Sequence, residues 1–112
     1  MEFGIFFELS VPRPFTEGIE RAVYERSLEQ VRLADALGYD TVWAVEHHFL
    51  EEYSHCSAPE VFLTAVAAQT QRIRVGHGAV VCVPKMNHPV RIAERAVRYA
   101  GVQERMIAAI TP

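Results

Sequence analysis

The stretch from Asp40 to Phe49 reads DTVWAVEHHF and carries the clearest pattern in the chain. Residues 41–45 are apolar, β-branched or aromatic, which is typical of a strand buried inside a sheet. The pattern then changes at once to Glu46, His47 and His48, so we expect the strand to end there. In parallel α/β folds, the loops after the carboxyl ends of the strands form the functional site. This stretch therefore predicts a buried strand and a candidate site at its end.

Strand-like and helical segments alternate on both sides of this stretch. The apolar run at residues 3–7 predicts a strand buried on both faces, and residues 73–76 open a further strand that we expect to continue through residues 79–83. Residues 106–110 fit either a helix or a strand. Apolar residues at helical spacing predict three helices, over residues 19–37, from Ser57 to about Thr70, and from Pro89 onward. The order βαβαβα indicates a parallel α/β chain with right-handed crossovers.

Local signals mark the ends of the predicted helices. Gly38 follows the first helix at the position where a left-handed C-cap is expected. Ser57 and Glu60 have the spacing of a capping box, and Pro59 between them suits the first turn of the second helix. We expect Gly101 to interrupt the third helix, because glycine costs about 1 kcal/mol relative to alanine in a helix interior.

Composition and charge restrict the class of protein. The chain has 112 residues, of which 50% are hydrophobic and 22% charged, as in one small globular domain. A net charge of -3 argues against an electrostatic nucleic-acid binder. The sequence shows neither a secretory signal nor the run of about 20 apolar residues that spans a membrane. Its two cysteines make no disulfide framework, so we expect a cytoplasmic protein.

Histidines gather in or beside the loops after the predicted strands, at positions 47, 48, 55 and 88. Histidine can donate or accept a proton near neutral pH, so His47 or His48 is a candidate acid/base group. A purely structural role for this pair has equal weight at this point. A metal site formed by His47, His48, His55 and Cys56 is disfavoured, because adjacent residues of an extended chain point to opposite faces and no HxxxH or HExxH spacing is present.

Two glycines, Gly76 and Gly78, flank His77 in the third predicted strand. The pattern lacks the GxGxxG spacing of a dinucleotide-binding loop, and it does not lead into a helix. The glycines allow either a bulge without a ligand or the close approach of a flat ligand to the backbone. Both interpretations stay open.

Several motifs occur together in a fixed order: FGIF at residues 3–6, DTVW at 40–43, EHHF at 46–49, VGHGAVV at 75–81 and HPVR at 88–91. This ordered set resembles the bacterial luciferase-like family of flavin-dependent monooxygenases over about residues 1–96. The resemblance implies a (β/α)8 barrel of the TIM type. The chain would hold the N-terminal βαβαβα portion of such a barrel.

The resemblance also implies chemistry. Family members use reduced FMN, or in some branches the deazaflavin F420, and the monooxygenases among them take dioxygen and a small-molecule substrate. His47 matches the family's catalytic histidine, which acts in acid/base steps around the reduced flavin. Gly78 and Ala79 match a non-prolyl cis peptide bond against which the flavin ring packs. A separate flavin reductase and a homodimer through the early helices are further expectations.

The sequence departs from the family pattern after Ala96. Residues 97–112 lack the family's continuation toward the next strand, and a complete barrel takes roughly 250 residues. We therefore interpret residues 1–112 as a partial, incomplete barrel domain with a divergent tail, belonging to a flavin-dependent monooxygenase or oxidoreductase. Two alternatives stay open: a non-catalytic module of the same fold that acts through association, and an F420-dependent oxidoreductase.

Overall fold

Four parallel strands form one sheet in the order β1-β2-β3-β4 in a computed structural model, which describes residues 1–102 and 106–108. The strands are β1 (Gly4–Phe7), β2 (Thr41–Ala44), β3 (Arg74–His77) and β4 (Met106–Ala108). The first three strands are followed by α1 (Ile19–Leu37), α2 (Pro59–Gln69) and α3 (Pro89–Val102). The predicted βαβαβα order is confirmed, and a fourth strand extends it. Within the described residues, no helix is both long and apolar enough to cross a membrane.

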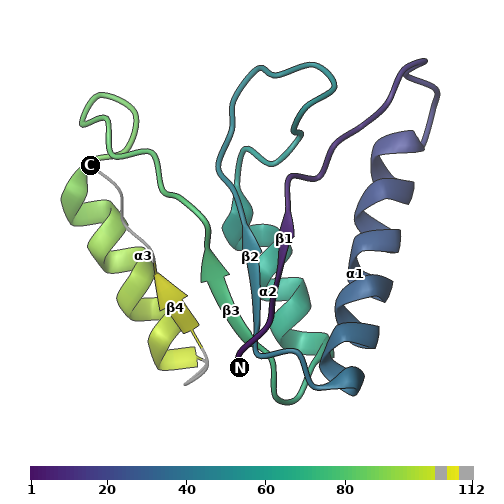
Figure 1. Ribbon diagram of the computed structural model, residues 1–112. Helices are drawn as coiled ribbons and strands as arrows, with labels where there is room; N and C mark the ends of the chain where they lie inside the picture. The colour runs from purple at the N-terminus through teal and green to yellow at the C-terminus, as the bar shows by residue number, and fades with distance from the viewer. Residues whose placement is uncertain (103–105, 109–112) are drawn as a thin grey trace.

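Parallel pairing brings the carboxyl ends of the strands to one edge of the sheet. Phe6 of β1 pairs with Trp43 of β2, and Trp43 pairs with Gly76 of β3. The loops after β1, β2 and β3 consequently gather at the top of Figure 1. This edge is the place where a parallel α/β fold forms its site.

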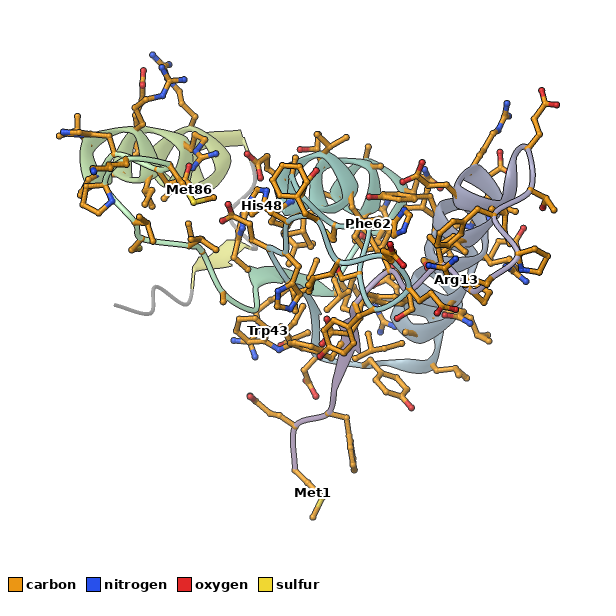
Figure 2. All side chains as sticks on the ribbon, turned by 90° about the horizontal axis from the view of Figure 1, so that it is seen from above. Met1, Arg13, Trp43, His48, Phe62 and Met86 are labelled. Atoms are coloured by element: carbon orange, nitrogen blue, oxygen red, sulfur yellow. The ribbon has the colours of Figure 1, made fainter. Side chains whose placement is uncertain are left out.

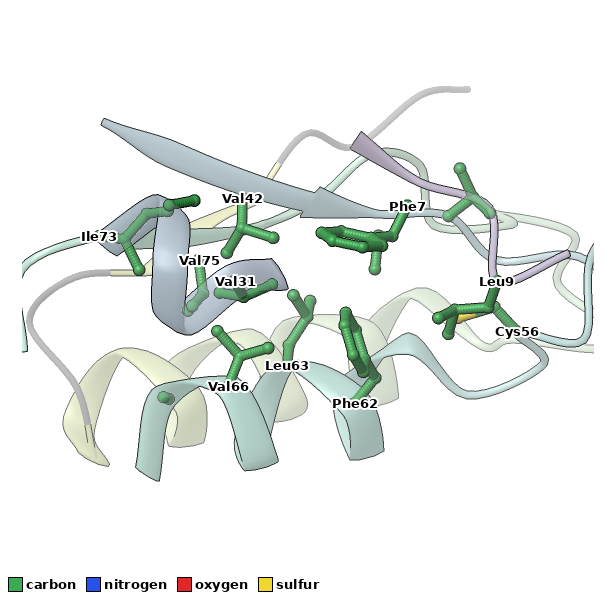
Figure 3. Close-up of a cluster of buried hydrophobic side chains, with 14 of the residues drawn as sticks. Phe7, Leu9, Val31, Val42, Cys56, Phe62, Leu63, Val66, Ile73 and Val75 are labelled. Carbon is green, nitrogen blue, oxygen red and sulfur yellow. The ribbon is translucent and has the colours of Figure 1, made fainter. Parts of the chain in front are cut away.

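One face of the sheet packs against α1 and α2 and forms the core (Figure 3). The rings of Phe7 and Phe62 meet edge to face, with their centroids 5.5 Å apart. Side chains of this size contribute about 1.5–3 kcal/mol each when fully buried, so this layer holds the helices on the sheet. The buried side chains of the layer are Phe7, Val42 and Val75 from the strands, Val31 from α1, and Phe62, Leu63 and Val66 from α2.

The opposite face of the sheet carries exposed aromatic side chains. Phe6 is 55% exposed, and Trp43 lies on the side of the sheet away from Phe62 (Figure 2). The prediction that the run at residues 3–7 is buried on both faces is therefore wrong, since Phe7 is its one buried residue. The reason is that α1 and α2 cover a single face of β1 and β2.

Two of the three signals predicted for the ends of α1 and α2 are confirmed. Gly38 caps α1 in the left-handed conformation with φ 87°, and Pro59 is the first residue of α2, as predicted. The capping box is wrong, because α2 has Ala58 as its N-cap and, in the described residues, no side-chain capping bond there. Glu60 instead binds the guanidinium of Arg95 at 2.8 Å.

The third strand is shorter than predicted. It ends at His77, and the expected continuation through residues 79–83 is wrong. Gly78 still donates its N–H to the Ala44 carbonyl of β2 at 2.7 Å. The N–H of Val81 donates to the Glu46 carboxylate at 2.9 Å, and beyond His77 the segment keeps only a single bridge, at Val81.

The third helix is longer than predicted. It runs through Gly101 to Val102, so the expected interruption at Gly101 is wrong. Residues 106–108, which fit either kind of element by sequence, form β4 beside β3. Residues 109–110 of that ambiguous segment lie outside the described residues.

Asp35, near the end of α1, fixes the turn that leads into β3. Its carboxylate accepts backbone N–H bonds from Gln71 at 2.8 Å, Arg72 at 3.0 Å and Ile73 at 2.7 Å. Burial by itself would raise the pKa of Asp35, but these bonds outweigh burial and hold the pKa below its usual value. The side chain thus ties the first helix to the third strand.

Replacing Asp35 with alanine should lower the free energy of unfolding by on the order of 2 kcal/mol, because the three backbone donors lose their acceptor. The lowered pKa means that this stabilisation is present above the unfolded value of about 4 and is lost as the pH falls through the folded value. Urea unfolding of wild type and Asp35→Ala at neutral and at strongly acidic pH checks both points. A difference that does not shrink in acid would contradict this account.

The matched control is Glu29→Ala, because Glu29 is an exposed carboxylate on the same helix. Its effect on the free energy of unfolding should stay within about 0.5 kcal/mol at both pH values.

Candidate active site

Two loops at the carboxyl edge, residues 8–18 after β1 and residues 45–58 after β2, are hydrogen-bonded to each other. The bonds run from an N–H or hydroxyl of one loop to a carbonyl of the other: Val11 to Glu52 (3.1 Å), His55 to Leu9 (3.1 Å) and Ser54 to Glu8 (2.6 Å). A site built from both loops is therefore held in place before any ligand binds.

Backbone strain marks the same two loops. Leu9 has φ 53° and Phe49 has φ 58°, which is left-handed backbone that favours glycine. Each such residue costs of order 1–3 kcal/mol and persists where its surroundings hold it, often at functional sites. Leu9 directly follows Glu8 and Phe49 directly follows His48, so the strain lies next to the polar residues of the edge.

His47 lies at the end of β2 with its backbone and its ring both held. Its N–H donates to the Cys56 carbonyl at 2.9 Å, and its imidazole makes a T-shaped contact with the Tyr53 ring at 5.5 Å between centroids. Its Nε2 lies 3.5 Å from Oε2 of Glu8. The His47 side chain is 36% exposed, so it can meet both a carboxylate and a small molecule.

His48 points the other way. Its Nε2 lies 2.9 Å from Oε1 of the buried Glu46, on the side of the sheet that faces the helices (Figure 2). Side chains of an extended chain alternate between faces, and the alternation set by β2 continues past its end. The expectation that His47 and His48 point to opposite faces is therefore confirmed.

Glu46 is the centre of a buried polar network. Besides His48, its carboxylate accepts the Val81 N–H at 2.9 Å and the Asn87 side-chain N–H at 2.8 Å. The network extends from Asn87 through Arg95 to Glu60, with two further bonds of 2.8 Å. It joins the end of β2 to the loop after β3 and to α2 and α3.

Glu8 follows the first predicted strand and Glu46 follows the second, but the sequence does not predict either as a site residue. A sequence signal for both exists, because each is the first charged residue after an apolar strand. His47 is predicted from a similar position, one residue further along. Asn87 and Arg95 carry no comparable signal, since polar residues are ordinary in a loop and on a helix.

Gly78 lies directly under an aromatic ring. A Cβ built on Gly78 would approach Cε2 of Phe6 to 2.7 Å, so a larger residue at this position requires the Phe6 ring to move. The implied cis bond between Gly78 and Ala79 is not seen, because the one cis peptide bond in residues 1–102 and 106–108 is Arg13–Pro14. The segment nevertheless bends at Gly78.

An open cleft of about 670 Å³ lies over the loop after β2. His47 and His48 both contribute to its lining, whereas Gly78 and Ala79 do not. The lining residues are Phe15, Glu20, His47, His48, Phe49, Leu50, Glu51, Ser54, His55 and Ser57.

The remaining candidate histidines differ in environment. The Glu20 carboxylate, 2.9 Å from Nδ1 of His55, and the Glu51 carbonyl raise the pKa of His55. Burial lowers the pKa of His77, which faces the helices at the end of β3. His55 therefore favours its charged form and His77 its neutral form.

Cys56 is fully buried, and burial raises the pKa of its thiol to about 12. A thiol that stays protonated is a poor nucleophile and a poor metal ligand. Across the described residues, no three His, Cys, Asp or Glu side chains are placed to hold a metal ion.

Several known proteins that resemble this chain are monooxygenases. The sequence model of the luciferase-like monooxygenases matches residues 1–100. 4-Hydroxyprotoasukamycin monooxygenase of Streptomyces nodosus subsp. asukaensis is 38% identical over 98 residues, which cover 88% of this chain and 25% of that protein. Limonene 1,2-monooxygenase of Rhodococcus erythropolis is 40% identical over 97 residues, which cover 87% of this chain and 24% of that protein. The chain thus spans about a quarter of the length of these relatives.

Solved structures give the same result for the fold. The oxygenating constituent of 3,6-diketocamphane monooxygenase of Pseudomonas putida, a type II Baeyer-Villiger monooxygenase in complex with FMN, superposes with a TM-score of 0.84 at 22% identity. The superposition covers 99% of this chain and 29% of that one. The βαβαβα unit is therefore an incomplete part of a (β/α)8 barrel, as the motifs imply. The chain belongs to the luciferase-like monooxygenase family.

Proposed function

We propose that this chain forms the part of a flavin-dependent monooxygenase that supplies the acid/base residue, His47. The reaction would use reduced FMN and dioxygen to oxidise a small organic substrate. The observation that carries the proposal is the position of His47 at the carboxyl edge of the sheet, exposed to an open cleft and 3.5 Å from the Glu8 carboxylate. A histidine so placed can move a proton to or from a bound molecule.

The uncovered face of the sheet suits the flat ring of a flavin. Phe6, Trp43 and Gly76 are in register across β1, β2 and β3, and Gly78, two residues beyond Gly76, lies beside the Phe6 ring. Phe6 is half exposed, so a ring can cover it. We propose that Gly78 and Ala79 contact the flavin at this surface. When bound, a reduced flavin supplies the electrons that reduce dioxygen.

The Glu46 network supports this surface from behind. The bond from Val81 to Glu46 fixes the bend that begins at Gly78 and Ala79. A carboxylate of such low exposure is stable because several donors surround it.

Replacing Glu46 with leucine should lower the free energy of unfolding by about 3 kcal/mol, because the donors of Val81 and Asn87 lose a buried acceptor. Glu46→Gln keeps one carbonyl acceptor and should lose less. Urea unfolding monitored by tryptophan fluorescence measures both variants. Glu94→Leu makes the same exchange at an exposed site of α3 and should have little effect. If Glu46→Leu is as stable as Glu94→Leu, the network contributes nothing.

Partners follow from the same proposal. A flavin reductase would deliver the reduced cofactor, and the enzyme would work in the cytoplasm. A homodimer through the early helices is supported by exposed apolar side chains on α1 and α2, among them Leu33, Leu37 and Val61 at 60%, 68% and 67% exposure.

The 112-residue chain by itself should bind FMN weakly or not at all, because it spans a quarter of the relatives and the other strands of the barrel contribute to such a site. Titration of FMN with the purified chain, followed by flavin fluorescence, should give no saturation. A dissociation constant in the micromolar range would contradict this expectation.

A chimera tests the proposed function directly. Residues 1–96 of this chain would replace the matching segment of limonene 1,2-monooxygenase, which gives the assay a known substrate. His47→Ala in the folded chimera should lower kcat with reduced FMN by about 10²–10⁴-fold, as expected for loss of an acid/base group. His88→Ala, at an exposed loop histidine, is the control.

The chimera also separates the alternatives. Turnover with reduced F420 but not with reduced FMN would favour the deazaflavin-dependent oxidoreductase. A folded chimera without turnover under either condition would favour the non-catalytic module. Unchanged kcat in His47→Ala would rule out His47 as the acid/base group.

A further inference from the structure

Glu8 and His47 are side by side because their strands are neighbours. β1 pairs with β2 through Phe7 and Ala44, and Glu8 follows Phe7 directly. Phe7 points into the core, so Glu8 points to the opposite face. His47 lies on that same face, because alternation from the buried Ala44 places it there. Strand pairing therefore joins a carboxylate and an imidazole that are far apart in the sequence.

The two oxygens of the Glu8 carboxylate have different surroundings. Oε1 accepts the hydroxyl of Tyr53 at 3.2 Å. Oε2 is buried and has no hydrogen-bond partner among the described residues, and Nε2 of His47 lies 3.5 Å from it. A buried carboxylate oxygen without a donor is costly, so an N–H on Nε2 of His47 would satisfy it.

The surroundings hold both members of the pair. Tyr53 donates its hydroxyl to Glu8, and its ring makes a T-shaped contact with the imidazole of His47. The charge of Glu8 raises the pKa of the Tyr53 hydroxyl, which therefore stays protonated as a donor. Ser54 fixes the Glu8 carbonyl, and Cys56 fixes the His47 N–H. A small rotation of either side chain brings the two atoms within the roughly 3.2 Å of an N–H···O bond.

We propose that Glu8 is the positioning residue for His47. Its Oε2 accepts the Nε2–H of the imidazole, which leaves Nδ1 as the ring nitrogen that takes up a proton. The proton binds the Nδ1 lone pair, and the carboxylate stabilises the imidazolium that results. This inference rests on the proposed function, in which His47 is the acid/base group.

Nuclear magnetic resonance of the ¹⁵N-labelled 112-residue chain tests the contact without flavin or substrate. In wild type, His47 should give a ring Nε2–H cross-peak that is protected from exchange with water, assigned by its loss in His47→Gln. Glu8→Leu should lose the cross-peak to exchange. Glu8→Gln should keep it but shift it upfield, because a neutral acceptor makes a weaker bond than a carboxylate.

Backbone amide spectra show whether each variant is folded, and Glu8→Gln decides the question if Glu8→Leu is not. Glu17→Leu, at an exposed position of the same loop, is the control and should leave the cross-peak unchanged. The proposal is overturned if wild type lacks the cross-peak, or if both Glu8 variants leave it as in wild type.

The chimera with limonene 1,2-monooxygenase then separates this inference from the proposed function. Glu8→Gln should lower kcat about tenfold and leave KM unchanged, because it affects the proton-transferring residue and not the substrate. If the cross-peak behaves as expected but His47→Ala leaves turnover unchanged, Glu8 is still the partner of His47 and the proposed function fails alone. If His47→Ala abolishes turnover and Glu8→Gln does not lower it, the positioning role fails alone.

Discussion

The buried carboxylate of Glu46 holds the functional edge of this chain together. It draws on donors from three segments: the end of β2, the bend after β3, and Asn87, which in turn binds Arg95 of α3. A charge with so little exposure is stable only while these donors stay in place, so the segments cannot drift apart independently. The position of the loop after β3 therefore depends on Glu46, a side chain just beyond β2.

The same side-chain alternation that buries Glu46 exposes its neighbour. His48 follows Glu46 to the helix side of the sheet, and His47 is left on the uncovered side with Glu8. The two adjacent histidines thus have different partners, Glu46 for His48 and Glu8 for His47, although both line the cleft. The strained residues Leu9 and Phe49 directly follow Glu8 and His48 in the sequence. Such strain is expected where a fold holds reactive groups in fixed positions.

Most of the fold could be predicted from local pattern. The bounds of α1 and the C-cap at Gly38 follow from helical spacing and a glycine, both of which act within a few residues. Predictions failed where a distant residue competed: Glu60 left its expected capping bond for Arg95, and Val81 left the expected strand for Glu46. In the candidate site, His47 could be named from its motif, whereas Glu8 could not be paired with it before the strand register was known.

The amino-acid order alone determined the alternation of strands and helices, the family motifs and the edge at which polar residues collect, because each depends on periodicity and on residue type. Only the tertiary structure decided which polar residues meet. Strand pairing and helix packing set the contacts of Glu8 with His47 and of Glu46 with Asn87, and they join segments that no local pattern relates. A buried carboxylate needs hydrogen-bond donors, whereas an exposed one does not. Burial is set by the packing of the sheet and helices and not by any single stretch of chain.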